Sequence, residues 1–447
     1  MDDISLESRL ARTLHRTARV AAIVCAVVLL LGRPGLDAQS GNAASHWVGT
    51  WATAVVSSEE PPPDLRALRR PPGSQQAPTQ TPPRIQSLND QTLRQVIHTS
   101  IGGPRIRAAL TNAFGTSALT IGSAQVALRA KAAAIVPNSG RALMFSGRSS
   151  VTIPPGGVMI SDPLDFPVQP ASDVVIDVFV PQDTAGMPLT MHTAAAQTNY
   201  LSKPGNYVGA VEFPVAQTTT SWYLLSRVDV LTSTSVSAVV TFGDSITDGV
   251  GSTINANQRW PDFLARRLSA AGQSMGVLNL GISGNRLLSD RVGPNALSRF
   301  DRDVAAQSGI MYVVVLLGIN DIGLAGDAAL PIPADLIGAY RQLIARAHAR
   351  GLRIYGATLT PFEGAAYYTS VGEDKRRQVN TWIRTSREFD GVIDFDAVVH
   401  DPMQPMKMLA AYDVGDHLHF ADKGYQAMAA ALDLSWFAAA QGLRAAR

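Results

Sequence analysis

The sequence contains a single cysteine, Cys25, among its 447 residues. That residue lies inside an apolar run close to the N-terminus, so a chain processed beyond the run has no cysteine left. Such a chain forms no internal disulfide and has no cysteine nucleophile. Its fold must be stabilised by a hydrophobic core, and hydrophobic residues make up 46% of the sequence, which is ample at this length.

The sequence also lacks an excess of either positive or negative charge. The 38 Lys and Arg residues are nearly balanced by 36 Asp and Glu residues, and no long basic run with interleaved aromatic residues occurs. Nucleic acid is therefore not an expected partner. No predicted strand is followed by a Gly-x-Gly-x-x-Gly motif or a phosphate-loop lysine, so we expect no bound cofactor.

The first 38 residues have the pattern of an export signal. Four arginines between residues 9 and 19 precede the apolar run at 20–32. This run is shorter than the ~20 residues of a comfortable membrane span. Small residues near "LDAQS" suit cleavage after Ala38. We expect a secreted or periplasmic protein with no stable membrane insertion once the signal is removed, and the alternative is an uncleaved membrane anchor.

Residues 46–235 are predicted to form a β-sandwich or jelly-roll-like domain. Short runs rich in β-branched residues, such as "SDVVIDVFVP", alternate with clusters of Gly, Pro, Asn and Ser. The segment 59–84 is dense in Pro and Gln and predicts an exposed irregular loop.

Residues 236–447 change to alternating strands and helices. Apolar runs such as "SAVVTFG", "MGVLNLG" and "IMYVVVLLG" are typical of strands buried on both faces, and helix-length segments such as 295–307 separate them. The alternation predicts a flavodoxin-like α/β/α domain with a parallel sheet. The functional site of such a sheet lies beyond the carboxyl ends of its strands.

Polar motifs follow the predicted strands at that edge. Gly-Asp-Ser at 243–245 ends the first strand, "NLGISGNRLL" at 279–288 follows the second, and "LGINDIG" at 317–323 follows the third. A fourth motif, "DVGDHLHF" at 413–420, precedes the last predicted helix. All four motifs contain glycine, which lets backbone N–H groups approach a ligand closely.

In this order, the four motifs resemble those of the SGNH hydrolases, a family of esterases and lipases with a Gly-Asp-Ser motif. The resemblance implies a serine esterase whose catalytic triad is Ser245, His419 and Asp416. It also implies an oxyanion hole made by the N–H groups of Ser245 and Gly284 and the side-chain amide of Asn320. The stretches "HWVGTWATA", "QTLRQVIHTSIGG" and "LTNAFG" resemble the β-domain that precedes the hydrolase domain in a subset of secreted bacterial members.

The chemistry of these residue types agrees with the resemblance. Serine is a weak nucleophile until a base takes its proton, and the ordinary pKa of a histidine, ~6.5, suits that role. Asp416 lies three residues before His419 and can orient the imidazole from a tight turn. The α/β-hydrolases share the order Ser, Asp, His but carry Gly-x-Ser-x-Gly. Around Ser283 the last glycine of that motif is replaced by Asn285, which excludes that fold.

Several assignments have alternatives. Ser245 could cap a helix, since serine is a preferred N-cap residue. His417 lies four residues after Asp413 and is the rival base. His417 and His419 could also be a metal pair, although no third ligand stands near them in the sequence. His98 and His192, in the β-rich half, are expected to be ordinary polar residues.

We expect the protein to hydrolyse acyl esters of a small molecule or a polysaccharide. Carbohydrate O-acetylesterase, lipase and acyltransferase activities stay open, because the sequence shows neither the size of the acyl pocket nor the acceptor. The alternative from another class is a cell-surface binding protein whose catalytic half is inactive.

Overall fold

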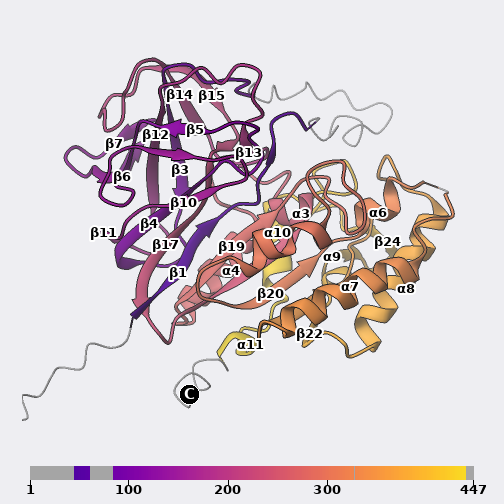
Figure 1. Cartoon of the computed structure of the whole chain (residues 1–447). Helices are drawn as coiled ribbons and strands as arrows, with labels where there is room; N and C mark the ends of the chain where they lie inside the picture. The colour runs from indigo at the N-terminus through magenta and orange to yellow at the C-terminus, as the bar shows by residue number, and fades with distance from the viewer. Residues whose placement is uncertain (1–44, 61–83, 327, 439–447) are drawn as a thin grey trace, which may run out of the picture. The chain divides into compact units, whose positions relative to one another are not determined.

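The computed structural model describes residues 45–60, 84–326 and 328–438 (Figure 1). The predicted signal segment at 1–38 and most of the predicted irregular loop at 59–84 lie outside these residues. The described residues from Ser45 onward belong to one compact unit. Within the described ranges, no helix is long and apolar enough to cross a membrane.

The N-terminal part of this unit consists of antiparallel sheets. One sheet contains, in spatial order, β1 (Ser45–Ala52), β17 (Leu225–Ser233), β4 (Gly103–Thr111) and β10 (Val158–Ile160), with β11 (Leu164–Val168) also paired to β4. A larger sheet contains β15 (Val215–Thr219), β14 (Asn199–Pro204), β3 (Gln91–His98), β12 (Asp173–Val180), β6 (Ser123–Lys131) and β7 (Ala134–Ile135), with β8 (Arg141–Leu143) beside β6. The predicted β-rich region is confirmed.

Two smaller groups of strands complete this region. A three-stranded sheet contains β16 (Trp222–Tyr223), β13 (Thr190–His192) and β2 (Val56–Ser57), and β5 (Leu119–Ile121) pairs with β9 (Val151–Ile153). The three residues of β13 are all buried, although one of them is a histidine.

The C-terminal part contains a five-stranded parallel sheet. Its spatial order is β19 (Met275–Gly281), β18 (Ser237–Gly243), β20 (Ile310–Leu316), β21 (Arg353–Ala357) and β22 (Gly391–Ile393). Of the strands of this sheet, the second in sequence, β19, is at the edge, and the first, β18, lies next to it. This is the flavodoxin-like order. All seven residues of β18 are buried, as its mostly apolar and β-branched pattern predicts.

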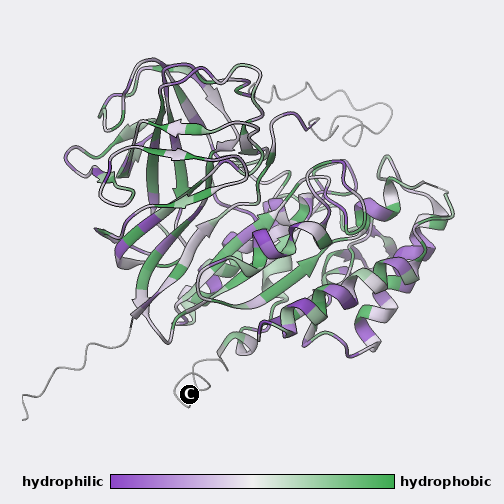
Figure 2. Ribbon diagram, in the orientation of Figure 1, coloured by the Kyte–Doolittle hydropathy of each residue, from purple (hydrophilic) through white to green (hydrophobic). Residues whose placement is uncertain are grey.

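Helices cover this sheet. Helices α4 (Trp260–Ala270) and α10 (Asp422–Ala430) pack together, as do α7 (Pro333–His348) and α8 (Ser370–Thr385). Pro261 and Pro333 lie in first turns, where the missing N–H of proline costs no hydrogen bond. Figure 2 shows hydrophobic residues along the sheet strands and alternation of hydrophilic and hydrophobic residues along α7 and α8. The predicted flavodoxin-like α/β/α fold is confirmed.

The segment 295–307, predicted as one helix, has two geometries. A short helix α5 (Ala296–Arg299) is followed by a π-helical turn, η1 (Phe300–Ala305). The side chain of Arg299, at this junction, is fully buried. It reaches the edge of the sheet, where it donates to the carbonyls of Gly243 and Leu280. A π-turn inside a helix often marks a functional site, and here it precedes β20.

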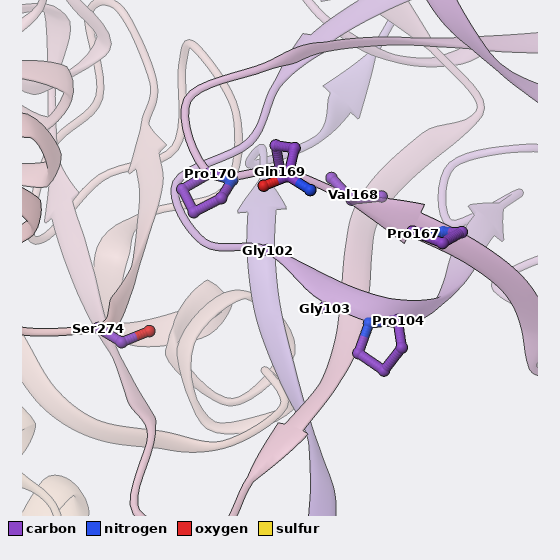
Figure 3. Close-up of a pocket in the computed structure, with 8 residues that line it drawn as sticks. All are labelled: Gly102, Gly103, Pro104, Pro167, Val168, Gln169, Pro170 and Ser274. Carbon is purple, nitrogen blue, oxygen red and sulfur yellow. The ribbon is translucent and has the colours of Figure 1, made fainter.

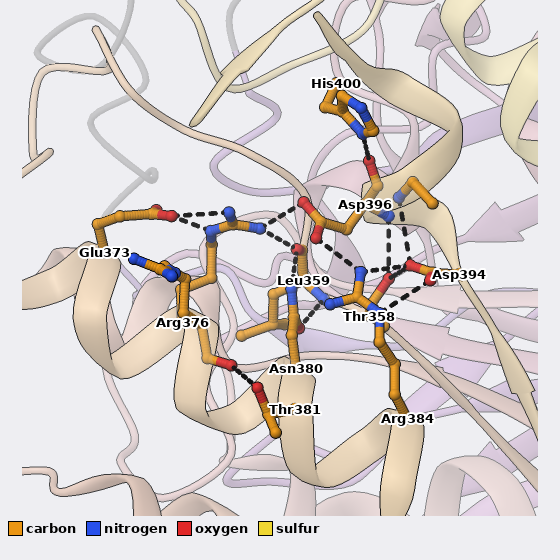
Figure 4. A network of polar contacts seen from close by, with 12 residues as sticks. Thr358, Leu359, Glu373, Arg376, Asn380, Thr381, Arg384, Asp394, Asp396 and His400 are labelled. Carbon is orange, nitrogen blue, oxygen red and sulfur yellow. Dashed lines mark hydrogen bonds and ion pairs between the residues drawn. The ribbon is translucent and has the colours of Figure 1, made fainter. Parts of the chain in front are cut away.

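A polar network fixes the loop after β21 (Figure 4). Arg376 on α8 forms a bidentate ion pair with Glu373 and donates a 2.7 Å hydrogen bond to the carbonyl of Leu359. The Asn380 side chain both accepts from the N–H and donates to the carbonyl of Leu359. Asp396, on α9 (Phe395–Val399), accepts a further bond from Arg376 at 2.6 Å. The loop is therefore held at both backbone polar groups of one residue.

The β-rich region packs along the edge of the parallel sheet. Strand β1 contacts β19, and a Cβ on Gly276 would lie only 2.1 Å from the carbonyl oxygen of Gly49, so the two backbones touch. The N–H of Val277 donates to Ser100 Oγ at 3.0 Å. The predicted boundary between domains 46–235 and 236–447 falls in the turn between β17 and β18. That these regions are separate domains stays a prediction, because one hydrophobic core runs through both.

Candidate active site

Three parallel strands bring their polar motifs together at one edge of the sheet. The last residue of β18, Gly243, is paired with Gly281 on β19 and Leu316 on β20, so the three strands end at the same level. Helix α3 (Ser245–Asp248) starts directly after β18, and α6 (Ile319–Gly323) starts directly after β20. The loops that carry the predicted site residues are therefore neighbours.

The N-cap of α3 is Asp244. Its carboxylate accepts a hydrogen bond from the N–H of Ile246 at 3.1 Å. The alternative interpretation, in which Ser245 caps this helix, is wrong. The hydroxyl of Ser245 is instead directed to a different partner.

That partner is a histidine from the far end of the chain. Ser245 Oγ lies 2.8 Å from His419 Nε2, and His419 Nδ1 lies 2.7 Å from Asp416 Oδ2. The other oxygen of Asp416 accepts bonds from the N–H groups of Leu418 and His419. Only 2% of Ser245 and 0% of His419 are exposed. The structure thus brings these three predicted residues into one buried hydrogen-bonded chain, and their catalytic roles stay a prediction.

The charge of Asp416 follows from its surroundings. Burial tends to raise the pKa of this carboxyl, but the hydrogen bond and charge of His419, together with two backbone N–H donors, outweigh burial and lower the pKa. Asp416 is therefore ionised at neutral pH. An ionised Asp416 holds the Nδ1–H tautomer of His419 and leaves Nε2 free to accept a proton from Ser245.

The rival histidine occupies a different position. His417 Nδ1 lies 2.6 Å from Asp413 Oδ2, and 43% of its side chain is exposed. Its φ of +60° turns the backbone so that His417 and His419 have different partners. Among the residues that the structure describes, no group of three His, Cys, Asp or Glu side chains could hold a metal ion. The metal-pair alternative therefore finds no third ligand there.

The predicted oxyanion donors lie on adjacent loops. Asn320 donates from Nδ2 to the carbonyl of Asn285 at 3.1 Å, which places its amide beside Gly284. Its Oδ1 accepts from the hydroxyl of Tyr367 at 3.4 Å. Gly284 has a φ of +83°, a left-handed conformation that favours glycine. Within the described part of the chain, the N–H groups of Ser245 and Gly284 donate to no protein acceptor.

The loop that carries Gly284 is held by a buried carboxylate. Asp248, the last residue of α3, accepts from Ser283 N–H at 2.9 Å and from Ser283 Oγ at 2.6 Å through its Oδ2. Its Oδ1 lies 2.9 Å from His192 Nε2. His192, expected to be an ordinary polar residue of a strand or loop, lies in β13, is 3% exposed and contacts Asp248 on α3. No local motif distinguishes His192 in the sequence, because its partner is 56 residues away.

A buried arginine holds the strand ends together. Arg299 donates to the carbonyls of Gly243 and Leu280 at 3.0 and 2.9 Å, and to Asn285 Oδ1 at 3.0 Å. Asp303 accepts a further bond at 3.1 Å. Burial lowers the pKa of Arg299 to about 10, and Asp303 opposes that shift. Arg299 therefore remains charged at neutral pH and joins β18, β19 and the loop beside Gly284.

Two further carboxyl groups lie at this edge and differ from Asp416. Burial raises the pKa of Asp244 to about 7, and the nearby charge of Asp321 adds to the rise. One oxygen of Asp244 has no hydrogen-bond partner among the described residues. Burial also raises the pKa of Asp321 to about 6, although the N–H groups of Leu287 and Leu288 donate to it. Asp244 thus caps α3, and Asp321 holds the loop at Leu287 and Leu288.

The pocket in Figure 3 lies elsewhere in the molecule. It is lined by residues 102–104, residues 167–170 and Ser274, and none of these side chains is ionisable. Ser274 precedes the amino end of β19, whereas Ser245 follows the carboxyl end of the neighbouring strand. This pocket is therefore not part of the site around Ser245.

The sequence profile of a known family matches residues 241–427. It is described as the GDSL-like Lipase/Acylhydrolase family, and the match includes every predicted site residue. A search of curated proteins found no match.

Several solved structures are similar to part of the chain. A carbohydrate acetylesterase family member from Sinorhizobium meliloti has 18% identity and a TM-score of 0.37, covering 46% of this chain and 99% of that chain. An acetyl xylan esterase from Geobacillus stearothermophilus has 20% identity and a TM-score of 0.35, with coverages of 46% and 94%. A lipase/acylhydrolase from Enterococcus faecalis has 20% identity and a TM-score of 0.35, with coverages of 44% and 92%.

The hydrogen-bonded chain predicts that a fluorophosphonate reacts with Ser245 and with no other serine. Mass spectrometry of the labelled protein should locate the adduct on Ser245. In His419→Ala, labelling should slow by at least about 100-fold, because the base that accepts the serine proton is missing. His417→Ala should be labelled at the wild-type rate, since His417 pairs with Asp413. Equal slowing in both variants would contradict the assignment.

The raised pKa of Asp244 predicts a pH-dependent cost to stability. Folding raises this pKa from its ordinary 3.8 to about 7, so the folded state binds a proton that the unfolded state releases. The resulting stabilisation is complete below about pH 4 and is lost as the pH rises through 7. The thermal midpoint of Asp244→Asn, relative to that of wild type, should therefore be higher at pH 8 than at pH 5. A difference that is the same at both pH values would refute this reading.

Proposed function

Because residues 241–427 match the model of the GDSL-like lipase/acylhydrolase family, whose members hydrolyse ester bonds, we propose that the protein is a serine esterase with Ser245 as its nucleophile. The observation that carries the proposal is the buried chain from Asp416 through His419 to Ser245. The chain has the order of contacts that activates a serine hydroxyl: a carboxylate orients a histidine, and the histidine accepts the hydroxyl proton.

The first half of the reaction forms an acyl-enzyme. Ser245 Oγ bonds to the carbonyl carbon of the ester while its proton moves to His419 Nε2. The carbonyl oxygen becomes an oxyanion and accepts hydrogen bonds from the N–H groups of Ser245 and Gly284 and from Asn320 Nδ2. The intermediate then breaks the bond to the alcohol oxygen, which takes the proton from His419. Each oxyanion donor contributes about 3 kcal/mol to transition-state stabilisation.

The second half releases the acid. A water molecule attacks the acyl carbonyl as His419 takes one of its protons, and the same donors stabilise the second oxyanion. The bond to Ser245 Oγ breaks, the serine regains its proton from His419, and the carboxylic acid leaves. Asp416 stays ionised throughout and stabilises the imidazolium that forms in both halves.

We infer that the acyl group is short. Ser245 is 2% exposed and Asn320 is 1% exposed, so little space adjoins the atoms that would hold the ester carbonyl. The hydroxyl of Tyr367 also occupies this region, at 3.4 Å from Asn320 Oδ1. An acetyl or propionyl ester fits such surroundings better than a long acyl chain.

Hydrolysis of nitrophenyl esters with acyl chains of two to sixteen carbons tests both parts of the proposal. Residues 39–447 should turn over the two- and three-carbon esters, with kcat/KM falling as the chain lengthens. Ser245→Ala should lose at least about 10⁴-fold in kcat, because the covalent route is closed. Preference for the longest esters would contradict the short acyl group. A wild-type protein that neither hydrolyses any ester nor reacts with a fluorophosphonate would favour the binding protein instead.

We also propose that the protein is exported. The support is the arginine-rich segment followed by the apolar run at 20–32. In the native host, the mature protein should be recovered outside the cytoplasm with Gln39 as its first residue, as read by N-terminal sequencing. Recovery of the full chain in the membrane fraction would contradict cleavage and favour the anchor.

A further inference from the structure

His192 is a residue of the β-rich region that reaches the catalytic region. It ends β13, and its ring lies between two acceptors from different parts of the chain. Nδ1 is 2.8 Å from the carbonyl oxygen of Ala54, and Nε2 is 2.9 Å from Asp248 Oδ1. The side chains of His192 and Asp248 are 4% and 2% exposed, so water does not replace these contacts.

The partners define the protonation of the pair. A carbonyl oxygen only accepts, so Nδ1 carries a hydrogen. Asp248 accepts two hydrogen bonds from Ser283 through Oδ2, and a hydrogen on Nε2 of His192 completes the contact at Oδ1. Burial tends to lower the pKa of His192, but the charge and hydrogen bond of Asp248 and the carbonyl of Ala54 more than offset burial and raise the pKa. Arg259, the other charge that acts on the ring, opposes the rise.

Asp248 links this ring to the loop of the oxyanion hole. It lies three residues after Ser245 on α3, and its second oxygen holds both donors of Ser283. Ser283 directly precedes Gly284, whose N–H is a proposed oxyanion donor. Without His192, Asp248 Oδ1 would be buried with no hydrogen-bond donor. Leaving a buried polar atom unpaired is costly, and the carboxylate would relieve that cost by moving or by admitting water. Either change weakens its hold on Ser283.

We propose that His192 is a positioning residue for the oxyanion hole, which it acts on through Asp248 and Ser283. The proposal rests on the proposed esterase function. It makes the β-rich region a contributor to catalysis, because a ring from that region fixes a loop that the ester carbonyl would meet. The expected consequence of losing His192 is a lower kcat with little change in KM, since the donor matters most when the oxyanion forms.

Two substitutions separate hydrogen bonding from packing. His192→Phe keeps an aromatic ring beside Trp222, whose ring centroid is 5.6 Å away, and removes both N–H donors. His192→Gln places an amide N–H where Nε2 was, so it keeps a donor to Asp248 while losing much of the ring. If His192 acts by holding Asp248, Gln should retain more activity than Phe. If the ring only fills space, Phe should retain more than Gln.

The matched control is His98, another histidine of the β-rich region that contacts an aspartate. His98 Nδ1 lies 2.8 Å from Asp173 Oδ1, and this pair contacts neither α3 nor the loop of Ser283. His98→Phe makes the same chemical change away from the site. Its kcat should equal that of wild type.

The measurement is kcat and KM for the preferred nitrophenyl ester, together with the thermal midpoint of each variant. We expect kcat to fall about 10–100-fold in His192→Phe, as for other residues that orient a catalytic group, and to be partly restored in His192→Gln. Wild-type kcat in His192→Phe, a change in KM alone, or greater activity in Phe than in Gln would overturn the proposal. Should His192→Phe fail to fold, the test passes to His192→Gln and Asp248→Asn. A wild-type kcat in both of these variants would overturn the proposal as well. A wild-type protein without ester turnover or fluorophosphonate labelling would refute the esterase function, and the role of His192 would fall with it.

Discussion

The common level at which three parallel strands end is the constraint on which the rest of the site depends. Gly243 lies opposite Gly281 and Leu316, so three loops from distant parts of the sequence leave the sheet side by side. A shift of one residue in either pairing would displace the loops by about 3.3 Å and separate Ser245 from Gly284 or Asn320. Arg299 stabilises this register because it donates hydrogen bonds to carbonyls of two adjacent strands, β18 and β19.

The carboxyl groups at this edge show how one dry environment produces different charge states. Asp416 and Asp248 each receive several hydrogen bonds and face a histidine. Asp244 is as deeply buried but has one unpartnered oxygen, and its pKa rises to about 7. Burial tends to raise the pKa of Asp416, Asp321 and Asp244, and the partner of each decides the outcome. The hydrogen bond and charge of His419 overcome burial at Asp416, whereas the N–H donors at Asp321 and Asp244 do not. Fewer buried negative charges at one edge also means less mutual repulsion around Ser245.

Much of this arrangement could be predicted from the sequence because it follows from local pattern. The mostly apolar and β-branched run of β18 predicts a strand buried on both faces, and the glycine-containing motifs after β18, β19 and β20 predict where functional loops lie. The contact between Ser245 and His419 could be expected only through the order of all four motifs. Periodicity does not determine which of the two nearby histidines is buried. In the structure His419 is buried, whereas His417, with its positive φ, has a side chain that is 43% exposed.

Other features depend on tertiary contacts that no local pattern encodes. His192 meets Asp248 across the boundary between two architectures, and its short strand looks like any other buried strand of the β-rich region. The π-helical turn at Phe300–Ala305 has the apolar spacing of an ordinary helix, with Phe300 and Val304 buried four residues apart, so the sequence does not distinguish it from one. That Asp244 caps α3 in place of Ser245 also depends on side-chain direction, since both residue types are good N-caps.

The packing of β1 along β19 has a consequence for how the protein behaves among other proteins. Strand β19 is at the edge of the parallel sheet, where unpaired backbone groups can recruit a strand from another molecule. Gly49 lies against Gly276, and Ser100 Oγ accepts the N–H of Val277, so this edge is already occupied within the chain. The N-terminal region therefore covers this edge against strand pairing with another molecule, and a fragment without that region would expose both the edge and the part of the shared core that it covers.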